Sequence, residues 1–196
     1  WQTLKKNDNE LNMIRFLILI ISIMILSSCS LEKEFYENGN LKAKGKIANN
    51  QKNGKWKIYY EDENLFQVGK YLNGNEIGEW KIFHKNGKLK QIGEFNNGEQ
   101  TGEWNFYHSN GKRQGIGKLI NGERIGIWKW YFDNGQIQTE RKWNDGKLIE
   151  ILSCFDGNGN KLDKGTLRDG NGTMKLYDIN GNLLETLRYE NGELKK

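Results

Sequence analysis

Proline is absent from the 196 residues of this sequence. Proline cannot donate to a β-ladder and interrupts the interiors of helices and strands, so its absence is typical of a chain built from uninterrupted strands. Apolar residues are also scarce, at 36% of the chain. That share is low for a large packed core, but it suits a repeat array in which each unit contacts only its neighbours.

Histidine is nearly absent, and its two occurrences, His84 and His108, lie 24 residues apart. They share a repeat position that Tyr60 and Phe132 hold elsewhere. Equivalent residues in successive hairpins are two strands apart, which predicts a separation of about 10 Å. That is too far for the two rings to share a metal ion. We therefore expect both histidines to replace aromatic residues in the fold, and we predict no metal centre and no cofactor.

Cysteine is limited to Cys29 and Cys154. If Cys29 is acylated, as argued below, Cys154 has no partner for an intramolecular disulfide. Its repeat position is held elsewhere by large apolar residues (Ile58, Ile82, Phe106 and Trp130). We therefore expect Cys154 to be a small buried hydrophobe. A catalytic thiol needs a nearby base, and the sequence offers neither a nucleophile–base pair nor a phosphate loop, which predicts a protein that is not an enzyme.

Two short runs that begin at Asp156 and Asp169 combine aspartate, asparagine and glycine as calcium loops do. An EF-hand loop requires glycine at its sixth position and glutamate at its twelfth. In the first run Lys161 and Leu167 occupy these positions. Because Asp, Asn and Gly are also the residues that tight turns prefer, we interpret both runs as turns.

What the sequence does contain is a repeat. The stretch GEWKIFHKNGKLKQIGEFNNG begins at Gly78, and related stretches begin 24 residues earlier, at Gly54, and 24 residues later, at Gly102. A fixed period of this length indicates a repeat architecture. Two Asn-Gly pairs in each unit, such as Asn86-Gly87 and Asn97-Gly98, favour tight turns between antiparallel strands. The repeating unit is therefore predicted to be a β-hairpin.

The turn at Asn86-Gly87 predicts the register of the hairpin, with Lys85 opposite Lys88 and Trp80 opposite Gly93. Each large aromatic then lies across from a glycine, whose missing side chain leaves room for the ring. The residues predicted to hold the repeat in this way are Trp56, Trp80, Trp104, Trp128, Gly69, Gly93 and Gly117, with Gly45 and Gly165 in outer copies. Because side chains alternate across a strand, one surface of the sheet carries these residues, and we name it the tryptophan face.

The opposite surface, which we name the lysine face, is predicted to carry most of the strand lysines. They are Lys42, Lys44, Lys46, Lys55, Lys57, Lys70, Lys81, Lys90, Lys118, Lys129 and Lys142. The candidate binding residues among them and in the aromatic ladder between them are Lys57, Tyr59, Lys81, Phe83, Tyr107, Lys129 and Tyr131. Two interpretations stay open: the lysines keep the sheet solvated, or the face is a groove for an acidic partner.

The N-terminal region has the composition of an export signal. Met13 is the expected start, and an apolar run over residues 16–26 leads to Leu26-Ser27-Ser28-Cys29. A charged start, a short apolar run and small residues before a cleavage site are typical of a secretory signal peptide. We predict a boundary after residue 28, with upstream residues and signal in 1–28 and the hairpin repeats in 29–196. A plain signal peptide or a single-pass anchor are the alternatives.

The sequence resembles two known patterns. The elements G-x-W-x-x-[YF], N-G and G-x-[YF]-x-N-G resemble the MORN repeat variant of bacterial proteins. That resemblance implies an all-β fold: an elongated single-layer antiparallel sheet of seven tandem hairpins, whose first-strand aromatics are Phe35, Tyr59, Phe83, Tyr107, Tyr131, Phe155 and Tyr177. It also implies protein contacts, membrane association or, in some members, an antitoxin label. The Leu-Ser-Ser-Cys ending resembles a bacterial lipobox, which implies a diacylglycerol on the Cys29 thiol.

Together these features predict a lipid-anchored, non-catalytic binding scaffold in the bacterial cell envelope, at the outer membrane if the cell has one. The expected partners are a membrane, reached through lipidated Cys29, and a protein, with an acidic lipid or a glycan also open; nucleic acid is not expected for an exported protein. Two other functions are carried forward. One is an antitoxin or immunity role, and the other is glycan binding through exposed tryptophans, which burial of the four repeat tryptophans would disfavour.

Overall fold

The structure is a computed structural model that describes residues 12–16 and 30–195. Residues 12–16 form a short helix. Within the described ranges no helix is long and apolar enough to cross a membrane. Cys29 and most of the predicted signal segment lie outside the described residues, so its lipidation and the boundary after residue 28 stay predictions.

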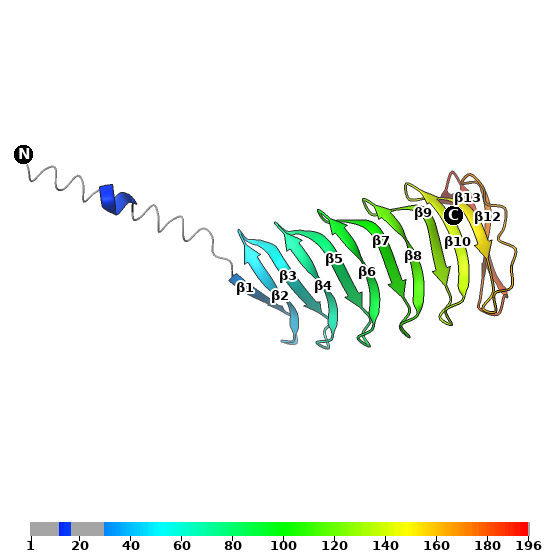
Figure 1. Ribbon diagram of the computed structural model, residues 1–196. Coiled ribbons are helices and arrows are strands. Elements are labelled where there is room, and N and C mark those ends of the chain that lie inside the picture. Colours follow the sequence, from blue (N-terminus) through cyan, green and yellow to red (C-terminus); the bar gives the residue numbers. More distant parts are fainter. Residues whose placement is uncertain (1–11, 17–29, 196) are drawn as a thin grey trace, which may run out of the picture.

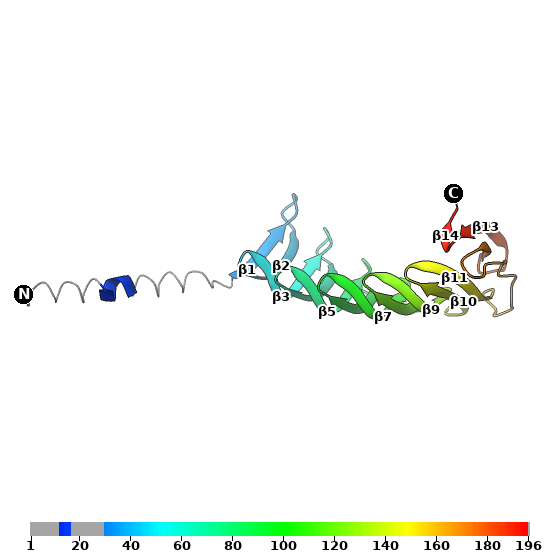
Figure 2. The same ribbon diagram turned by 90° about the horizontal axis from the view of Figure 1, so that it is seen from above.

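The rest of the described chain consists of fourteen strands and the loops between them, which confirms the all-β prediction. Eleven of them form one antiparallel sheet in which every strand is bonded to its neighbours in sequence (Figure 1). They are β1 (Ser30–Phe35), β2 (Leu41–Ala48), β3 (Gln51–Tyr59), β4 (Leu65–Leu72), β5 (Asn75–Phe83), β6 (Leu89–Asn96), β7 (Glu99–Tyr107), β8 (Arg113–Ile120), β9 (Glu123–Tyr131), β10 (Ile137–Asn144) and β11 (Lys147–Cys154). Seen from above, the hairpins follow one another in a long twisted row (Figure 2).

The turns along one long edge are two-residue turns, as predicted. Asn97 and Gly98 both have positive φ, 52° and 87°, and the flanking residues Asn96 and Glu99 pair directly. Two left-handed residues in succession match the right-handed twist of the flanking strands, which is why Asn-Gly is favoured here. The amide of each turn glycine also donates to a carbonyl of the preceding turn, as Gly98 does to Glu76 at 3.0 Å. The turns therefore stack into a second ladder along this edge.

The turns along the other edge differ from the prediction. The His84 amide donates to the Lys88 carbonyl at 2.8 Å and the Gly87 amide to the His84 carbonyl at 2.9 Å, so His84, rather than Lys85, is opposite Lys88. Only Gly87 is left-handed, with φ of 78°, and the register shifts by one residue after Ile82. In the equivalent loop Glu63 takes this conformation with φ of 64°. This loop therefore keeps the same geometry although it contains no glycine.

The predicted pairing within the hairpin is confirmed, but the predicted position of the ring is wrong. Trp80 pairs with Gly93 and Gly78 with Phe95. The Trp80 ring, however, does not cover Gly93. A Cβ built on Gly93 would collide with the ring of Trp104, and one built on Gly69 would collide with Trp80. Each tryptophan therefore lies over the glycine of the preceding hairpin.

A β-bulge explains where the rings lie. Between β6 and β7, Ile92 pairs with Asn105 and Glu94 with Thr101, so that residues 102–104 are all opposite Gly93. Gly102 begins this bulge with φ of 70°, in the left-handed region that glycine adopts without steric cost. The extra residues turn Trp104 back over the strand before it. Because of the bulge, Trp104 packs against the preceding hairpin rather than against its own.

The core of the long sheet is mainly a row of aromatic side chains on the tryptophan face, with Leu119 in the position that Tyr71 holds two repeats earlier. Trp56, Trp80, Trp104 and Trp128 are at most 2% exposed. Second-strand residues pack edge-on between them, as Tyr71 does against Trp80 with ring centroids 5.1 Å apart. Edge-to-face packing is the arrangement that aromatic quadrupoles favour. Burial of all four rings assigns them a structural role and removes the exposed surface on which tryptophan-mediated glycan binding depended.

The C-terminal part does not continue the sheet, whereas the prediction placed about seven tandem hairpins in one single-layer sheet. After β11 a separate three-stranded sheet follows, with strands β12 (Gly172–Tyr177), β13 (Leu183–Glu190) and β14 (Glu193–Leu194). The bulge glycine is replaced here by Glu150, which pairs with Lys142, and the single three-residue bulge becomes two one-residue irregularities, at Ile149 and Leu152. Ile151 is buried, although Leu152 is the residue that aligns with the repeat tryptophans. Gly165 meets the backbone of Thr173 and no tryptophan.

The small sheet closes the end of the array. Leu148 and Ile151 from β11 form one buried cluster with Leu167 and Met174. Leu167 is buried but lies outside the strands. The Leu148 amide donates to the carbonyl of Gly192 at 3.1 Å. Terminal units of repeat arrays are commonly atypical because they cover an otherwise open end, and this one does so.

Side chains also join the hairpins along the loop edge, which is the lower edge in Figure 1. Tyr60 Oη donates to the carbonyl of Phe83 at 2.8 Å. In the next units His84 Nε2 lies 2.8 Å from the Tyr107 carbonyl, and His108 Nε2 lies 2.9 Å from that of Tyr131. A carbonyl only accepts, so Nε2 carries the proton in both rings. The histidines therefore replace tyrosines, as predicted, and keep the tyrosine hydrogen bond.

The ring–glycine contact between hairpins predicts a specific coupling. Gly93→Ala should lower the free energy of unfolding by about 1–3 kcal/mol, because the added methyl group meets the buried Trp104 ring. In a Trp104→Ala background the same change should cost much less, whereas in a Trp80→Ala background it should keep its full cost. Denaturant unfolding of the single and double variants measures both couplings. Coupling to Trp80 and none to Trp104 would show that each ring covers its own hairpin.

The loop-edge hydrogen bonds predict different outcomes for two aromatic replacements of one histidine. His84→Phe should cost about 1 kcal/mol of stability, since the Tyr107 carbonyl loses its donor. His84→Tyr should be nearly neutral, because Tyr60 makes the equivalent bond. Thermal unfolding of both variants at neutral pH is the measurement, and equal stability of the two would mean that the ring alone matters.

Candidate binding faces

The predicted residues of the lysine face lie on one surface, but some of the lysines already pair with carboxylates. Lys81 Nζ lies 3.0 Å from a carboxylate oxygen of Glu79, and Lys129 Nζ lies 3.1 Å from one of Glu140. A hydrogen bond from Ser153, together with Lys129, lowers the pKa of the Glu140 carboxyl. Lys57 is exposed and has no carboxylate partner among the described residues. Two of the three predicted lysines are therefore already paired with an acid.

The predicted aromatic ladder lies at the loop end of this face. Tyr59, Phe83, Tyr107 and Tyr131 are all half-buried. The ammonium of Lys44 lies 5.6 Å from the centroid of the Tyr59 ring, within cation–π range. The ladder is therefore partly covered by lysine stems and offers edges rather than open ring faces.

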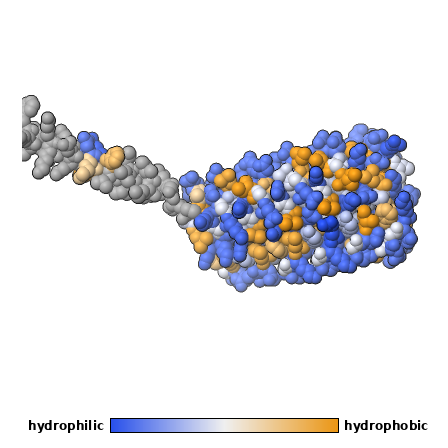
Figure 3. Space-filling view, viewed as in Figure 1, coloured by the Kyte–Doolittle hydropathy of each residue, from blue (hydrophilic) through white to orange (hydrophobic). Residues whose placement is uncertain are grey.

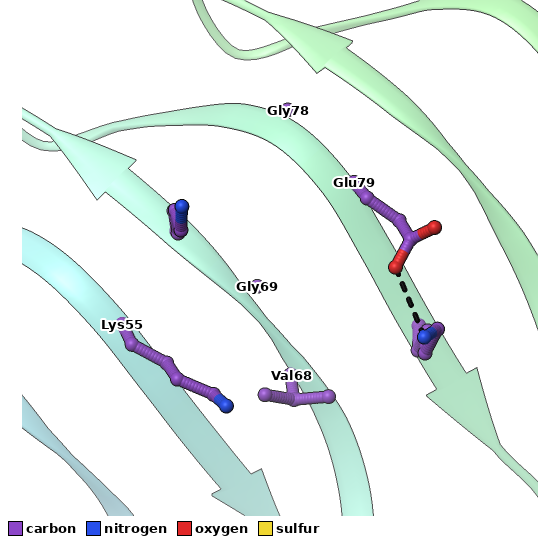
Figure 4. A pocket seen from close by; sticks show the side chains of 7 residues that line it. Lys55, Val68, Gly69, Gly78 and Glu79 are labelled. Atoms are coloured by element: carbon purple, nitrogen blue, oxygen red, sulfur yellow. Dashed lines mark ion pairs between the residues drawn. The ribbon is translucent and has the colours of Figure 1, made fainter.

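Two hollows on the lysine face follow from the bulges. The first, of about 320 Å³, lies around Gly69 and Gly78 and is lined by Lys55, Lys70 and Lys81 (Figure 4). The bulge glycine Gly78 supplies no side chain, and a Cβ built there would meet nothing within 4 Å, whereas one on Gly69 would meet the Trp80 ring on the opposite face. Val68 supplies an apolar wall, and Glu79 reaches across to Lys81.

The second hollow, of about 490 Å³, occupies the equivalent place two repeats further along. Lys118 and Lys129 take the places of Lys70 and Lys81, but Glu103 takes that of Lys55, and Glu140 also lines this hollow. In the intervening repeat the positions of Lys55 and Lys70 carry Glu79 and Glu94. The first hollow therefore has an excess of positive charge, whereas the second holds as many carboxylates as lysines.

Exposed aliphatic side chains accompany both hollows. Ile127 is 54% exposed and lines the second hollow. Leu72 and Ile120, both about half exposed, lie two residues beyond Lys70 and Lys118 and so share their face. The space-filling view shows apolar patches set among polar residues (Figure 3). Exposed aliphatics beside unpaired lysines are a combination that interaction surfaces use.

The tryptophan face carries a charged cluster that sequence reasoning missed. The Arg124 guanidinium carbon lies 5.0 Å from the ring centroids of both Trp128 and Trp143 and 5.7 Å from that of Trp130. Burial lowers the pKa of Arg124. A signal was available, because Lys52 lies three repeat periods earlier, above Trp56.

The remaining sequence candidates have structural roles. Asp156 Oδ1 accepts hydrogen bonds from the amides of Asn158 and Asn160, and Oδ2 accepts one from the Asn160 side chain. These bonds, led by that of the Asn160 side chain, lower the pKa of Asp156. The carboxylate is thus engaged within its own turn, as the turn interpretation requires. In the described part of the chain no group of three or more His, Cys, Asp or Glu is placed to hold a metal ion.

Cys154 is buried, as predicted, and its thiol is free. Burial raises the pKa of this thiol, which disfavours the reactive thiolate. The pKa of the neighbouring Arg141 is shifted in the opposite direction. Burial, and to a lesser extent the nearby Arg124, lower it to about 10, so the guanidinium is still cationic at neutral pH.

Comparison with known proteins assigns the chain to a family. No curated protein matches the sequence. The MORN repeat variant family matches residues 30–49, 52–73, 76–97, 100–121, 124–145 and 171–191. Five of these segments are successive hairpins of the long sheet, and the sixth covers β12 and β13 of the terminal one. The unmatched residues 146–170 contain β11 and the segment where Glu150 replaces the bulge glycine. With six matched repeats over most of its length, the chain belongs to the MORN repeat variant family.

Proposed function

We propose that this protein is a non-catalytic binding scaffold, held at a membrane of the bacterial cell envelope by a lipid on Cys29, whose lysine face binds an acidic protein. The observation that carries the proposal is the recurrence of a hollow at two equivalent places along one sheet, about 320 Å³ and 490 Å³ in volume. Each hollow is lined by an exposed lysine, Lys70 or Lys118, that has no carboxylate partner among the described residues. A repeated site on a repeat protein suits an extended partner better than a small molecule.

The charges in these hollows support an acidic partner. Lys55, Lys70 and Lys118 are exposed and belong to none of the ion pairs between described residues. An acidic surface would meet them without first breaking an existing pair. Leu72 and Ile120 beside them supply apolar contact area, which gives affinity where exposed charges mainly give steering.

The position of the anchor supports display of the face. Ser30, the residue after Cys29, is already the first residue of β1. A lipid on Cys29 would therefore sit at one end of the sheet, and both faces would extend away from it. An antitoxin or immunity role stays a prediction, and the buried tryptophans remove the basis of the proposed glycan site.

The lysine face can be tested by charge removal. Lys55→Gln, Lys70→Gln and Lys118→Gln together should leave the melting temperature nearly unchanged, since all three side chains are exposed. Binding of an acidic polypeptide probe, poly-L-glutamate, should weaken about tenfold and lose much of its salt dependence. Fluorescence titration of the full chain in detergent, at low and physiological salt, measures both.

The matched control removes the same charge from the terminal sheet and its connection. Lys161→Gln, Arg168→Gln and Arg188→Gln change exposed residues that lie far from the hollows in sequence. Equal weakening by both triple variants would reduce the effect to net charge and overturn the lysine-face proposal. Loss of binding to phosphatidylglycerol vesicles, with poly-L-glutamate binding intact, would instead assign the face to lipid.

The anchor has its own test. Cys29→Ala should abolish incorporation of labelled palmitate in bacteria that express the full chain and should leave the precursor uncleaved. Cys154→Ala is the matched control, because the Cys154 thiol is buried and should carry no lipid. Palmitate label that persists in Cys29→Ala would contradict the lipid anchor.

A further inference from the structure

The tryptophan face carries two equivalent aromatic cradles, each holding a cation. In the first, Lys52 Nζ lies 4.3 Å from the Trp56 ring centroid and 5.8 Å from that of Tyr71. In the second, three repeat periods further along, Arg124 lies over Trp128 and Trp143, which occupy the places of Trp56 and Tyr71. The same scaffold position therefore presents a cation at both ends of the long sheet.

The two cations differ in how their charge is balanced. Lys52 Nζ lies 3.0 Å from a carboxylate oxygen of Glu34. The residue equivalent to Glu34 beside Arg124 is Phe106. Among the described residues no carboxylate pairs with Arg124, and the same is true of Arg141, which lies on the same Trp130 ring. Two partly buried guanidinium groups thus share one aromatic cluster with no counter-ion.

Uncompensated buried charge is costly, and so are unpaired buried donors. The indole N–H groups of Trp130 and Trp143 are both buried without a hydrogen-bond partner. By contrast, Trp128 Nε1 in the same cluster donates to the carbonyl of Lys118 at 3.1 Å. Arg141 Nε donates to Thr139 Oγ1 at 3.0 Å. The cluster nevertheless has two guanidinium charges without a carboxylate partner and two indole donors without an acceptor among the described residues.

A cavity of about 390 Å³ opens beside the cluster. Arg124 and Trp128 line it, Gln91 and Gln100 supply amide groups, and Phe106 and Leu119 supply an apolar wall. Glu123 also lines the cavity but belongs to none of the ion pairs between described residues, so it does not neutralise Arg124 directly. A cation, amide groups and aromatic walls together fit a small anionic group attached to an apolar body.

We propose that this cavity binds a carboxylate, presented by an acidic or chain-terminal residue of a peptide, with Arg124 as its principal partner. The guanidinium of arginine matches the two oxygens of a carboxylate, and its stacking on three indole rings holds it in place before the ligand arrives. The ligand supplies the charge that Glu34 supplies to Lys52. The site lies on the face opposite the lysines, so it is independent of the lysine-face proposal.

Indole signals in nitrogen-15 NMR of the full chain in detergent provide the test, with three capped dipeptide probes at constant ionic strength. N-acetyl-Gly-Phe has a free terminal carboxylate, N-acetyl-Glu-Phe-amide has only a side-chain carboxylate, and N-acetyl-Gly-Phe-amide has none. At least one carboxylate probe should shift the Trp130 and Trp143 signals and bind at least tenfold more tightly than the neutral probe, as one charge-assisted hydrogen bond allows. The carboxylate probe that binds more tightly shows whether the site takes a terminal or a side-chain carboxylate. Equal binding of all three probes, or binding of none, would overturn the proposal.

Two variants remove the site in different ways. Arg124→Gln deletes the cation, and Phe106→Glu places a carboxylate where Glu34 stands in the first cradle; each should weaken the carboxylate probe at least tenfold. Lys52→Gln, which deletes the already paired cation, is the matched control and should change binding less than twofold. The Trp56 and Trp80 signals report whether each variant is folded. Undiminished binding in a folded Arg124→Gln or Phe106→Glu variant would contradict the assignment, as would equal loss in Lys52→Gln. The lysine-face triple variant should bind the probe normally, so failure of one proposal leaves the other intact.

Discussion

The structure depends on one contact: a tryptophan ring that lies flat over a glycine of the hairpin before it. Within a hairpin, backbone hydrogen bonds and the Asn-Gly turns are sufficient to define the pairing. Two-stranded hairpins are marginal alone, so the array needs interactions that cross from one to the next. The bulge at Gly102 directs Trp104 onto Gly93, and a side chain at Gly93 would exclude the ring. Stability therefore grows by neighbour contacts, as in other repeat proteins.

The same bulge shapes both surfaces. On the tryptophan face it buries the indole rings, and the row of residues beside them, which includes Lys52 and Arg124, packs onto their faces. On the lysine face the bulge glycine Gly78 leaves the backbone open beside Lys55 and Lys70. The core of each repeat thus requires specific residues at only a few positions, and the remaining positions are free to vary from one repeat to the next. Function in this scaffold is expected at positions such as Arg124, where the repeats differ.

Sequence predicted the period, the hairpins and the pairing of Trp80 with Gly93, because turn residues and strand alternation are local. It could not predict the direction of the ring, because the bulge at Gly102 shows itself only through φ, and glycine is compatible with many conformations. The end of the sheet was missed for a related reason. With Glu150 in place of the bulge glycine, Ile151 is the buried residue, and the cap depends on contacts between distant segments. The Arg124 cluster was missed because it brings together residues of two strands, β9 and β10.

The most direct measurement is the nuclear Overhauser effect between glycine Hα protons and tryptophan ring protons in the full chain. The account predicts cross-peaks from Gly69 to Trp80, from Gly93 to Trp104 and from Gly117 to Trp128, with upfield ring-current shifts of the glycine protons. Cross-peaks from Gly93 to the ring of Trp80, with none to Trp104, would contradict it. In that case each hairpin would hold its own ring, and another contact would have to join the repeats.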